Sequence, residues 1–158
     1  MITAYRVFNS LFSATWNDGE GAFRYGGRWN SQGKRVLYFS SSLALATLEI
    51  LVNLDDEEIL PDFSYASVSF PEELVAGSED LGKLPLNWRE FPIPEAVQKI
   101  GDDWVKSKRS AILQVPTAIL PKEWNYVVNL DHPDSGLVQY GKVESLILDS
   151  RLFGRTKK

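Results

Sequence analysis

The chain has 158 residues, of which 44% are hydrophobic and 24% are charged, with a formal net charge of −4. The length predicts one domain, and this composition is typical of a soluble globular protein. The chain contains no cysteine and one histidine, His132, which excludes disulfides, thiolate catalysis and a site built from several histidines, so we expect no bound metal.

The charge is unevenly distributed along the chain. Residues 1–54 carry five basic and three acidic side chains, whereas the remainder carries 12 basic and 18 acidic ones. A small anion fits this pattern better than a nucleic acid, which usually requires a broadly basic face. No apolar run is long enough to cross a bilayer, and the first ten residues do not resemble a signal peptide. We therefore expect no membrane association and a cytoplasmic location.

The predicted secondary structure is a mixture of several strands and two long helices. Alternating, β-branched and aromatic runs predict strands over residues 3–8, 35–39, 64–70, 111–115, 126–130 and 143–149. Apolar periodicity predicts helices over residues 43–53 and 95–106. Residues 9–33 and 76–94 are rich in glycine or proline and read as long irregular segments. Since few strand–helix–strand units recur, we predict an α+β fold around a largely antiparallel sheet, with residues 1–154 as the domain and residues 155–158 as a frayed basic tail.

One carboxylate stands out in the first long helix. Residues 43–54 read LALATLEILVNL, in which only Thr47, Glu49 and Asn53 are polar. A helix that is apolar nearly all round is expected to be buried, and buried carboxylates are rare unless they are paired or have a function. Glu49 is therefore a candidate catalytic residue. The structural alternative is a buried ion pair with an arginine.

A glycine turn lies about twenty residues before Glu49, in the sequence YGGRWN. Gly26 and Gly27 would let the backbone approach a ligand, and Arg28 would offer a bidentate fork to a phosphate or pyrophosphate. The plain alternative is an ordinary turn whose arginine stacks on tryptophan. Tyr38, in the following predicted strand, is either a core residue with a satisfied hydroxyl or a surface on which a ligand ring stacks.

Together, several segments of the sequence resemble the RES domain, the toxin of bacterial RES–Xre toxin–antitoxin pairs. These segments are Tyr5-Arg6, GGRWN, VLYFSSSLALATLEIL and RSAILQVPTAILPKEWNYVVNLDHPD, and the resemblance spans residues 5–150. By this resemblance, the active-site residues are Arg28, Tyr38 and Glu49, and Ser110 is the best match to the family's serine. Thr117 stands in a VPTA segment where the family pattern leads us to expect VPSA, so the position of that serine stays open.

The resemblance implies a fold similar to ADP-ribosyltransferases and an enzyme that consumes NAD⁺. Arg28, Tyr38, Gly27, Arg6 and Asn129 would bind NAD⁺, which is the substrate, and no other cofactor is expected. A role for His132 in a turn is at least as well supported as a catalytic one.

The expected function is that of a toxin that cleaves the nicotinamide–ribose bond by hydrolysis or phosphorolysis. The alternatives are ADP-ribosylation of a host protein and a non-enzymatic binding module in which Arg28 and Glu49 form a buried ion pair. An Xre-family antitoxin is the implied partner, with DNA contacted only through that antitoxin. No Gly-x-Gly-x-x-Gly segment follows a predicted strand, which argues against a hydride-transferring Rossmann enzyme.

Overall fold

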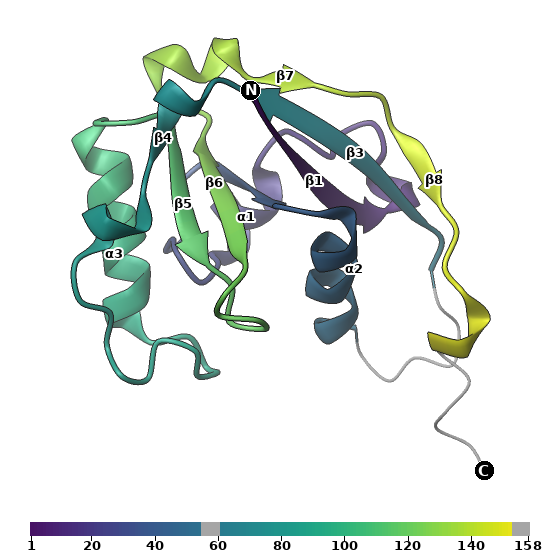
Figure 1. Cartoon of the computed structure of the whole chain (residues 1–158), viewed down its shortest axis with the longest axis horizontal. Helices are drawn as coiled ribbons and strands as arrows, with labels where there is room; N and C mark the ends of the chain where they lie inside the picture. The colour runs from purple at the N-terminus through teal and green to yellow at the C-terminus, as the bar shows by residue number, and fades with distance from the viewer. Residues whose placement is uncertain (55–60, 153–158) are drawn as a thin grey trace.

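The computed structural model describes residues 1–54 and 61–152, and the predicted tail at residues 155–158 lies outside these ranges. Within them the chain forms one curled sheet of eight strands in the order β4-β5-β6-β2-β1-β3-β7, and β8 pairs with β3 beside β7 (Figure 1). The strands are β1 Ile2–Asn9, β2 Val36–Ser40, β3 Phe63–Phe70, β4 Val75–Ala76, β5 Ile112–Pro116, β6 Trp124–Asn129, β7 Gln139–Tyr140 and β8 Glu144–Leu146. Only the short β4–β5 pair is parallel, which confirms the predicted α+β fold with a largely antiparallel sheet.

The two predicted helices are present, and a third, shorter helix was not predicted. The helices are α1 Glu20–Tyr25, α2 Leu43–Val52 and α3 Glu95–Ser107, and short 3₁₀ turns occur at η1 Ser10–Phe12, η2 Glu72–Leu74, η3 Ser78–Leu81, η4 Pro133–Leu137 and η5 Ser150–Leu152. The sequence analysis assigned α1 to a loop because Gly19 and Gly26 flank it and Gly21 lies within it. The Asp18 carboxylate accepts a hydrogen bond from the Glu20 backbone N–H (2.9 Å) and so satisfies one free donor of the first turn.

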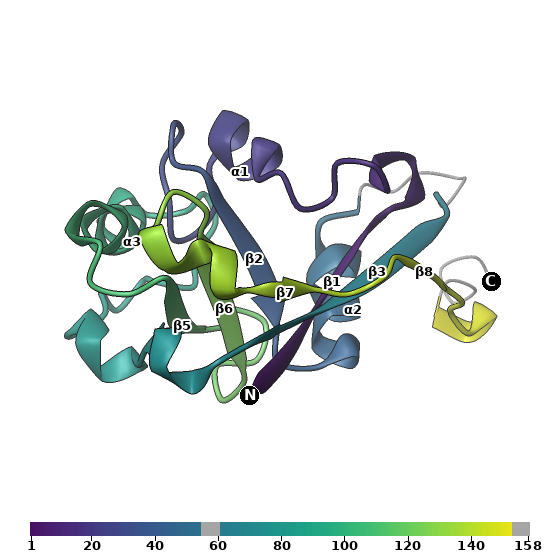
Figure 2. The same ribbon diagram turned by 90° about the horizontal axis from the view of Figure 1, so that it is seen from above.

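The sheet opens between its two halves at the β1–β2 junction. β1 and β2 pair at a single position, Tyr5 with Ser40. By contrast, β1 runs beside β3 over its whole length, and β2 runs beside β6 over its whole length. Helix α2 follows β2 directly and packs against β1 and β2 near this opening (Figures 1 and 2). The opening therefore places α2 between the two halves of the sheet.

Alternating residues of the strands form separate apolar clusters on the two faces of the sheet. Leu37 and Phe39 of β2 belong to one cluster, in which Trp16 from the segment before α1 stacks on Phe8 with ring centroids 5.5 Å apart. Val36 of β2 faces the other way and packs in the cluster covered by α3. A smaller cluster lies between α2 and the first strands, with Val7, Ala46 and Phe63 as its buried members.

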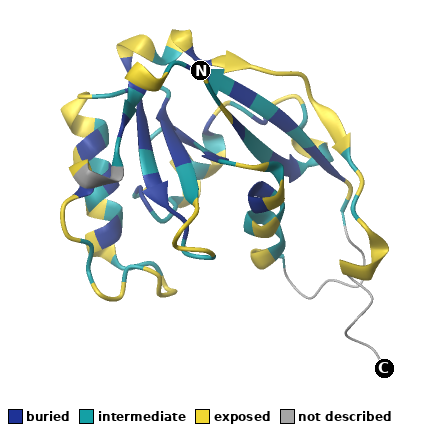
Figure 3. Ribbon diagram, in the orientation of Figure 1, coloured by how far each residue is buried: buried dark blue, intermediate teal, exposed yellow. Residues whose placement is uncertain are grey.

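Helix α2 is less buried than its composition predicts. Leu45 and Ala46 are its buried residues, whereas Leu48 is 42% exposed and Val52 is 64% exposed. Figure 3 shows both buried and exposed residues along this helix. The expectation of a buried helix is therefore wrong, because α2 lies at the rim of the sheet and only one side of it meets a strand. In the described part of the chain, no helix is both long enough and apolar enough to pass through a bilayer.

Helix α3 lies unusually close to the glycine turn after α1. Gly101 of α3 faces the Trp29 backbone, and a Cβ atom at Gly101 would overlap the Trp29 carbonyl. The Asp102 carboxylate also accepts hydrogen bonds from the Ser31 backbone N–H (2.9 Å) and hydroxyl (2.6 Å). Helix α3 thus packs against the turn that carries Arg28 and supports its backbone.

We expect Gly101→Ala to destabilise the protein strongly, because the added methyl group must displace either α3 or the Trp29 backbone. Overpacking of this kind costs about 1–3 kcal/mol or more. Gly21→Ala is the matched control, since Gly21 is also helical and a Cβ there meets no atom within 4 Å. Replacing a helical glycine by alanine in open space should raise stability by up to about 1 kcal/mol. Urea unfolding of both variants measures the difference, and equal stability would contradict the close packing.

Candidate active site

Glu49 is held by two neutral donors from the opposite half of the sheet. Its Oε1 atom accepts a hydrogen bond from the Thr117 hydroxyl (2.6 Å) and another from the Asn125 side-chain amide (2.7 Å). Thr117 directly follows β5, and Asn125 lies in β6, so the antiparallel pairing of these strands brings the two donors together. Helix α2 presents Glu49 from the other side, and the Ser42 side chain caps its first turn by accepting from the Leu45 N–H (3.1 Å).

The two donors are themselves held by further hydrogen bonds. The Asn125 carbonyl oxygen accepts from the Ser40 hydroxyl (2.8 Å), and the Thr117 hydroxyl oxygen accepts from the Ile119 N–H (3.1 Å). Thr117 is 1% exposed, so water does not compete for its hydroxyl. These contacts leave the Thr117 proton and the Asn125 amide hydrogens directed at Glu49.

The second carboxylate oxygen of Glu49 is left for another partner. Oε2 takes part in none of the hydrogen bonds within residues 1–54 and 61–152, and these ranges contain no ion pair between Glu49 and an arginine. The buried Arg28–Glu49 ion pair of the binding-module interpretation is therefore not formed. The two neutral donors orient the Glu49 carboxylate without placing an opposite charge against it.

The glycine turn is held from two sides, by Tyr38 of β2 and by Gln98 of α3. The Tyr38 hydroxyl donates to the Asn30 side-chain oxygen (2.6 Å) and accepts from the Trp29 N–H (3.2 Å). The Gln98 amide of α3 donates to the carbonyl oxygens of Gly27 (3.0 Å) and Asn30 (3.2 Å). A Cβ at Gly27 would lie 2.8 Å from the Tyr38 hydroxyl, so the missing side chain makes room for Tyr38. The predicted role of Gly27 in the close approach of a ligand stays a prediction. Burial raises the pKa of Tyr38, which keeps its hydroxyl protonated as the donor.

Arg28 is oriented by backbone carbonyls of the segment before α3. Its Nη1 atom donates to the carbonyl oxygens of Trp88 (2.7 Å) and Glu90 (3.0 Å). Partial burial lowers the pKa of Arg28, and the negative charge of Glu49 acts in the opposite direction. A guanidinium has five N–H donors, so Nε and Nη2 of Arg28 are not occupied by these two bonds. The structure thus places a half-buried cation within electrostatic reach of the Glu49 carboxylate.

Ser110 is not part of this cluster. It precedes β5, whereas Thr117 follows β5, so the two lie at opposite ends of one strand. The Ser110 hydroxyl accepts from the indole N–H of Trp104 (2.8 Å) and donates to the Ile112 carbonyl (2.9 Å). Its contacts join α3 to β5. The hydroxyl that meets Glu49 is that of Thr117, the second position that the VPTA segment had left open.

Three other residues singled out in the sequence, Arg6, Asn129 and His132, bond to backbone groups. Arg6 donates from Nη1 to the Tyr38 backbone carbonyl (3.2 Å), and burial lowers the pKa of Arg6 to about 10. Asn129 accepts from the Asp131 N–H (3.1 Å) at the end of β6 opposite to Asn125. His132 caps η4 through Nδ1 and donates from Nε2 to the Lys108 carbonyl (2.9 Å), which supports its role in a turn. None of the three makes a hydrogen bond to the side chain of Glu49 or Arg28 in the described part of the chain.

The sequence analysis missed two asparagines that organise the site. Asn30 is fully buried, and its amide nitrogen donates to the carbonyl oxygens of Ala22 (3.0 Å) and Ser31 (2.9 Å). Asn125 was passed over because the predicted strand began one residue later, at Tyr126, whereas β6 begins at Trp124. One feature of the sequence could have revealed Asn125. In the run WNYVVN it lies on the same strand face as the buried Val127, where an apolar residue would be expected.

Comparison with known proteins assigns the class. A family model described as "RES domain" matches residues 3–149. "Prs ADP-ribosylating toxin" of Sphingobium sp. (strain YBL2) is 35% identical over 136 residues, covering 85% of this chain and 84% of that protein. "Toxin Res" of Photorhabdus laumondii subsp. laumondii is 37% identical over 126 residues, covering 79% and 80%. The crystal structure of the M. tuberculosis MbcT–MbcA toxin–antitoxin complex contains a chain that superposes with a TM-score of 0.73 at 21% identity, covering 92% of this chain and 84% of that one.

The curled, mostly antiparallel sheet with α2 at its opening is a fold that this protein shares with a chain of that toxin–antitoxin complex. The chain belongs to the RES domain family, and it is a toxin of that family. The resemblance and the fold inferred from the sequence are both confirmed.

We expect Tyr38→Phe to destabilise the protein without changing its fold. The variant leaves the fully buried Asn30 side-chain oxygen without its donor, which costs about 1–3 kcal/mol. The control is Tyr25→Phe, because Tyr25 is 78% exposed and lies outside the contacts that hold the turn. Chemical denaturation of the two variants measures the cost, and a Tyr38→Phe protein as stable as wild type would show that the hydroxyl is not a support of the turn.

Proposed function

We propose that this toxin cleaves NAD⁺ at the bond between nicotinamide and ribose. The observation that supports the proposal best is the position of Glu49, whose Oε1 is held by Thr117 and Asn125 while Oε2 is left for a ligand. A negative charge in such a position stabilises a sugar cation, which is the transition state of glycosidic bond cleavage. Because the chain resembles RES toxins that consume NAD⁺, we propose that this sugar is the ribose attached to nicotinamide.

The chemistry requires little from the protein beyond this charge. When the C1′–N bond breaks, both electrons go to the nicotinamide nitrogen, so the positively charged ring leaves as a neutral molecule and needs no proton. The ribose becomes an oxocarbenium-like cation. Glu49 Oε2 would accept a hydrogen bond from the ribose 2′-hydroxyl and stabilise this cation electrostatically. Water or phosphate would then attack C1′, and water would release one proton.

Arg28 and Tyr38 would position the substrate. Nε and Nη2 of Arg28 would bind the pyrophosphate, while Nη1 stays with the carbonyls of Trp88 and Glu90. The half-buried Tyr38 ring would stack on nicotinamide, in an orientation that the hydrogen bonds of its hydroxyl set.

ADP-ribosylation of a host protein is the second candidate. The specific observation in its favour is the name of one relative, "Prs ADP-ribosylating toxin", at 35% identity over most of both chains. Both reactions use the same first step and differ only in the nucleophile. Mass spectrometry of the products formed from NAD⁺ alone, with phosphate, and with cell lysate separates ADP-ribose, ADP-ribose 1″-phosphate and a modified protein.

An antitoxin is the proposed protein partner. The M. tuberculosis toxin of the same fold was solved as a toxin–antitoxin complex. The resemblance in sequence further implies an Xre-family antitoxin that would carry any contact with DNA. Co-expression with the product of a neighbouring gene and co-purification would test this partner.

Glu49→Gln should reduce nicotinamide release by about 10²–10³-fold. The amide oxygen can still accept from Thr117 and Asn125, so the shape of the cluster is kept, but the negative charge beside the ribose is lost. Free nicotinamide is measured by chromatography after incubation with NAD⁺.

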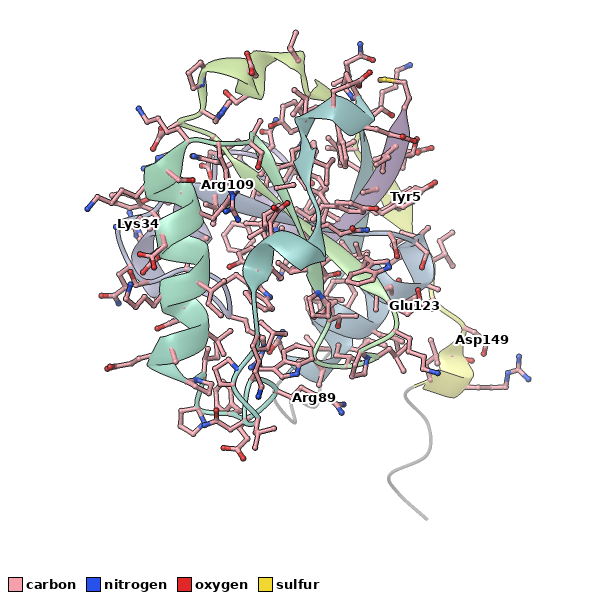
Figure 4. The ribbon with its side chains drawn as sticks, turned by 60° about the vertical axis from the view of Figure 1, so that its left-hand side comes forward. Tyr5, Lys34, Arg89, Arg109, Glu123 and Asp149 are labelled. Carbon is pink, nitrogen blue, oxygen red and sulfur yellow. The ribbon has the colours of Figure 1, made fainter. Side chains whose placement is uncertain are left out.

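Glu123→Gln is the matched control for this variant. Glu123 is an exposed carboxylate in the turn between β5 and β6, and the hydrogen bonds found for it involve its backbone (Figure 4). Its replacement should leave nicotinamide release unchanged. Near-normal turnover by a folded Glu49→Gln protein would contradict the proposed role of Glu49.

Arg28→Lys should weaken ligand binding although it conserves the charge. A lysine offers three donors on one atom, so it cannot hold two carbonyls and a pyrophosphate in the planar geometry of a guanidinium. Loss of one charge-assisted hydrogen bond predicts about tenfold weaker binding. Calorimetric titration of NAD⁺ into Glu49→Gln and into Glu49→Gln/Arg28→Lys measures the change. Equal affinities would show that Arg28 does not bind the pyrophosphate.

A further inference from the structure

A second arginine lies where the two sides of the site are joined. Residues 82–94 connect η3 to α3, and we call this segment the strap. Two carbonyls of the strap, those of Trp88 and Glu90, hold Nη1 of Arg28, and the Trp88 ring lies 6.1 Å from the Trp29 ring. Arg89 is the residue between these two carbonyls, and it lies at the edge of the molecule (Figure 4).

The Arg89 side chain reaches the turn that holds Glu49. Its Nε atom donates to the Ala118 carbonyl (2.9 Å), and Ala118 directly follows Thr117. Arg89 therefore connects the Arg28 side of the site to the Thr117–Glu49 side. This single bond occupies Nε, and within residues 1–54 and 61–152 no hydrogen bond uses Nη1 or Nη2 of Arg89. Nη1 and Nη2 of Arg89 therefore remain available for a ligand.

Neither guanidinium group has a carboxylate bound to it within residues 1–54 and 61–152. Arg28 and Arg89 donate to neutral carbonyls, and neither takes part in an ion pair in the described part of the chain. Burial lowers the pKa of Arg28, and the nearby positive charge of Arg89 acts in the same direction. An anion bound by both would offset the repulsion between the two charges and would accept hydrogen bonds from both.

We propose that Arg89 is a second anion-binding residue, and that Arg28 and Arg89 together bind the pyrophosphate of the dinucleotide. The inference rests on the proposed NAD⁺ site and assigns to it a residue that the sequence motifs did not include. Arg28 would contact the anion from the glycine turn, and Arg89 would contact it from the strap. The neutral carbonyls hold both side chains in place before the ligand arrives.

A purely structural role for Arg89 is the competing explanation, because its bond to Ala118 also pins the strap to the turn. Arg89→Gln separates the two roles, since a glutamine amide can still donate to the Ala118 carbonyl but carries no charge. Arg109→Ala is the matched control, because Arg109 is another exposed arginine that donates to a backbone carbonyl, that of Asp80 (3.1 Å) (Figure 4).

The experiment compares a ligand that contains the pyrophosphate with one that lacks it. ADP-ribose has the pyrophosphate but no nicotinamide to release, and nicotinamide riboside has no phosphate. Binding is measured as the ligand-induced shift of the unfolding midpoint at up to millimolar ligand, which reports weak affinities. We expect Arg89→Gln to bind ADP-ribose about tenfold more weakly than wild type and than Arg109→Ala. Its affinity for nicotinamide riboside should equal that of wild type, and Arg89→Lys should recover part of the loss.

Two results would overturn the proposal. Equal weakening of both ligands in Arg89→Gln would mean that Arg89 only pins the strap. An ADP-ribose affinity of Arg89→Gln equal to that of Arg109→Ala would mean that Arg89 does not contact the anion. If ADP-ribose binding depends on Arg89 but wild type releases no nicotinamide, the anion site stands and the proposed reaction fails. If wild type does not bind ADP-ribose, both fail.

Discussion

The contact of Glu49 with Thr117 and Asn125 is the interaction on which the site depends. One carboxylate oxygen is saturated by two short hydrogen bonds, and each donor is held by a further bond of its own. Because the donors are neutral, they orient the carboxylate without cancelling its charge. An arginine in the same place would orient Glu49 equally well but would neutralise it. The arrangement therefore separates the task of positioning from the task of supplying charge.

The fold explains why these groups come from both halves of a divided sheet. β1 and β2 meet at one residue pair only, so α2 lies at the opening and directs its polar side across to β5 and β6. On the Arg28 side of the site, α3 approaches the glycine turn so closely that Gly101 cannot carry a side chain. Helix α2 thus supports Glu49, and helix α3 supports the turn that carries Arg28. The apolar clusters beneath them are separate, with α3 covering one and α2 covering another.

The main helices, the strands and two of the candidate site residues could be predicted from local sequence patterns. The partners of Glu49 could not, because they depend on how distant strands pair. Glu49 and Arg28 could be singled out as candidates because each interrupts a recognisable local pattern, an apolar helix for Glu49 and a glycine turn for Arg28. Ser110 was chosen over Thr117 because a sequence gives no sign of which end of a strand meets α2. Asn125 was missed for the same reason, since its role is set by the antiparallel register of β5 and β6. Exposure of α2 was also misjudged, because composition does not reveal that a helix lies at the rim of a sheet.

The distance along the chain between Glu49 and its donors has a consequence for synthesis. Thr117 and Asn125 follow Glu49 by 68 and 76 residues. At about 5–20 residues per second, the ribosome would deliver the second donor roughly 4–15 s after the carboxylate. No early fragment of the nascent chain holds Glu49 in its oriented state. The site can therefore form only when most of the polypeptide has been made. Until then, for several seconds, the growing chain carries a Glu49 carboxylate that is not yet oriented.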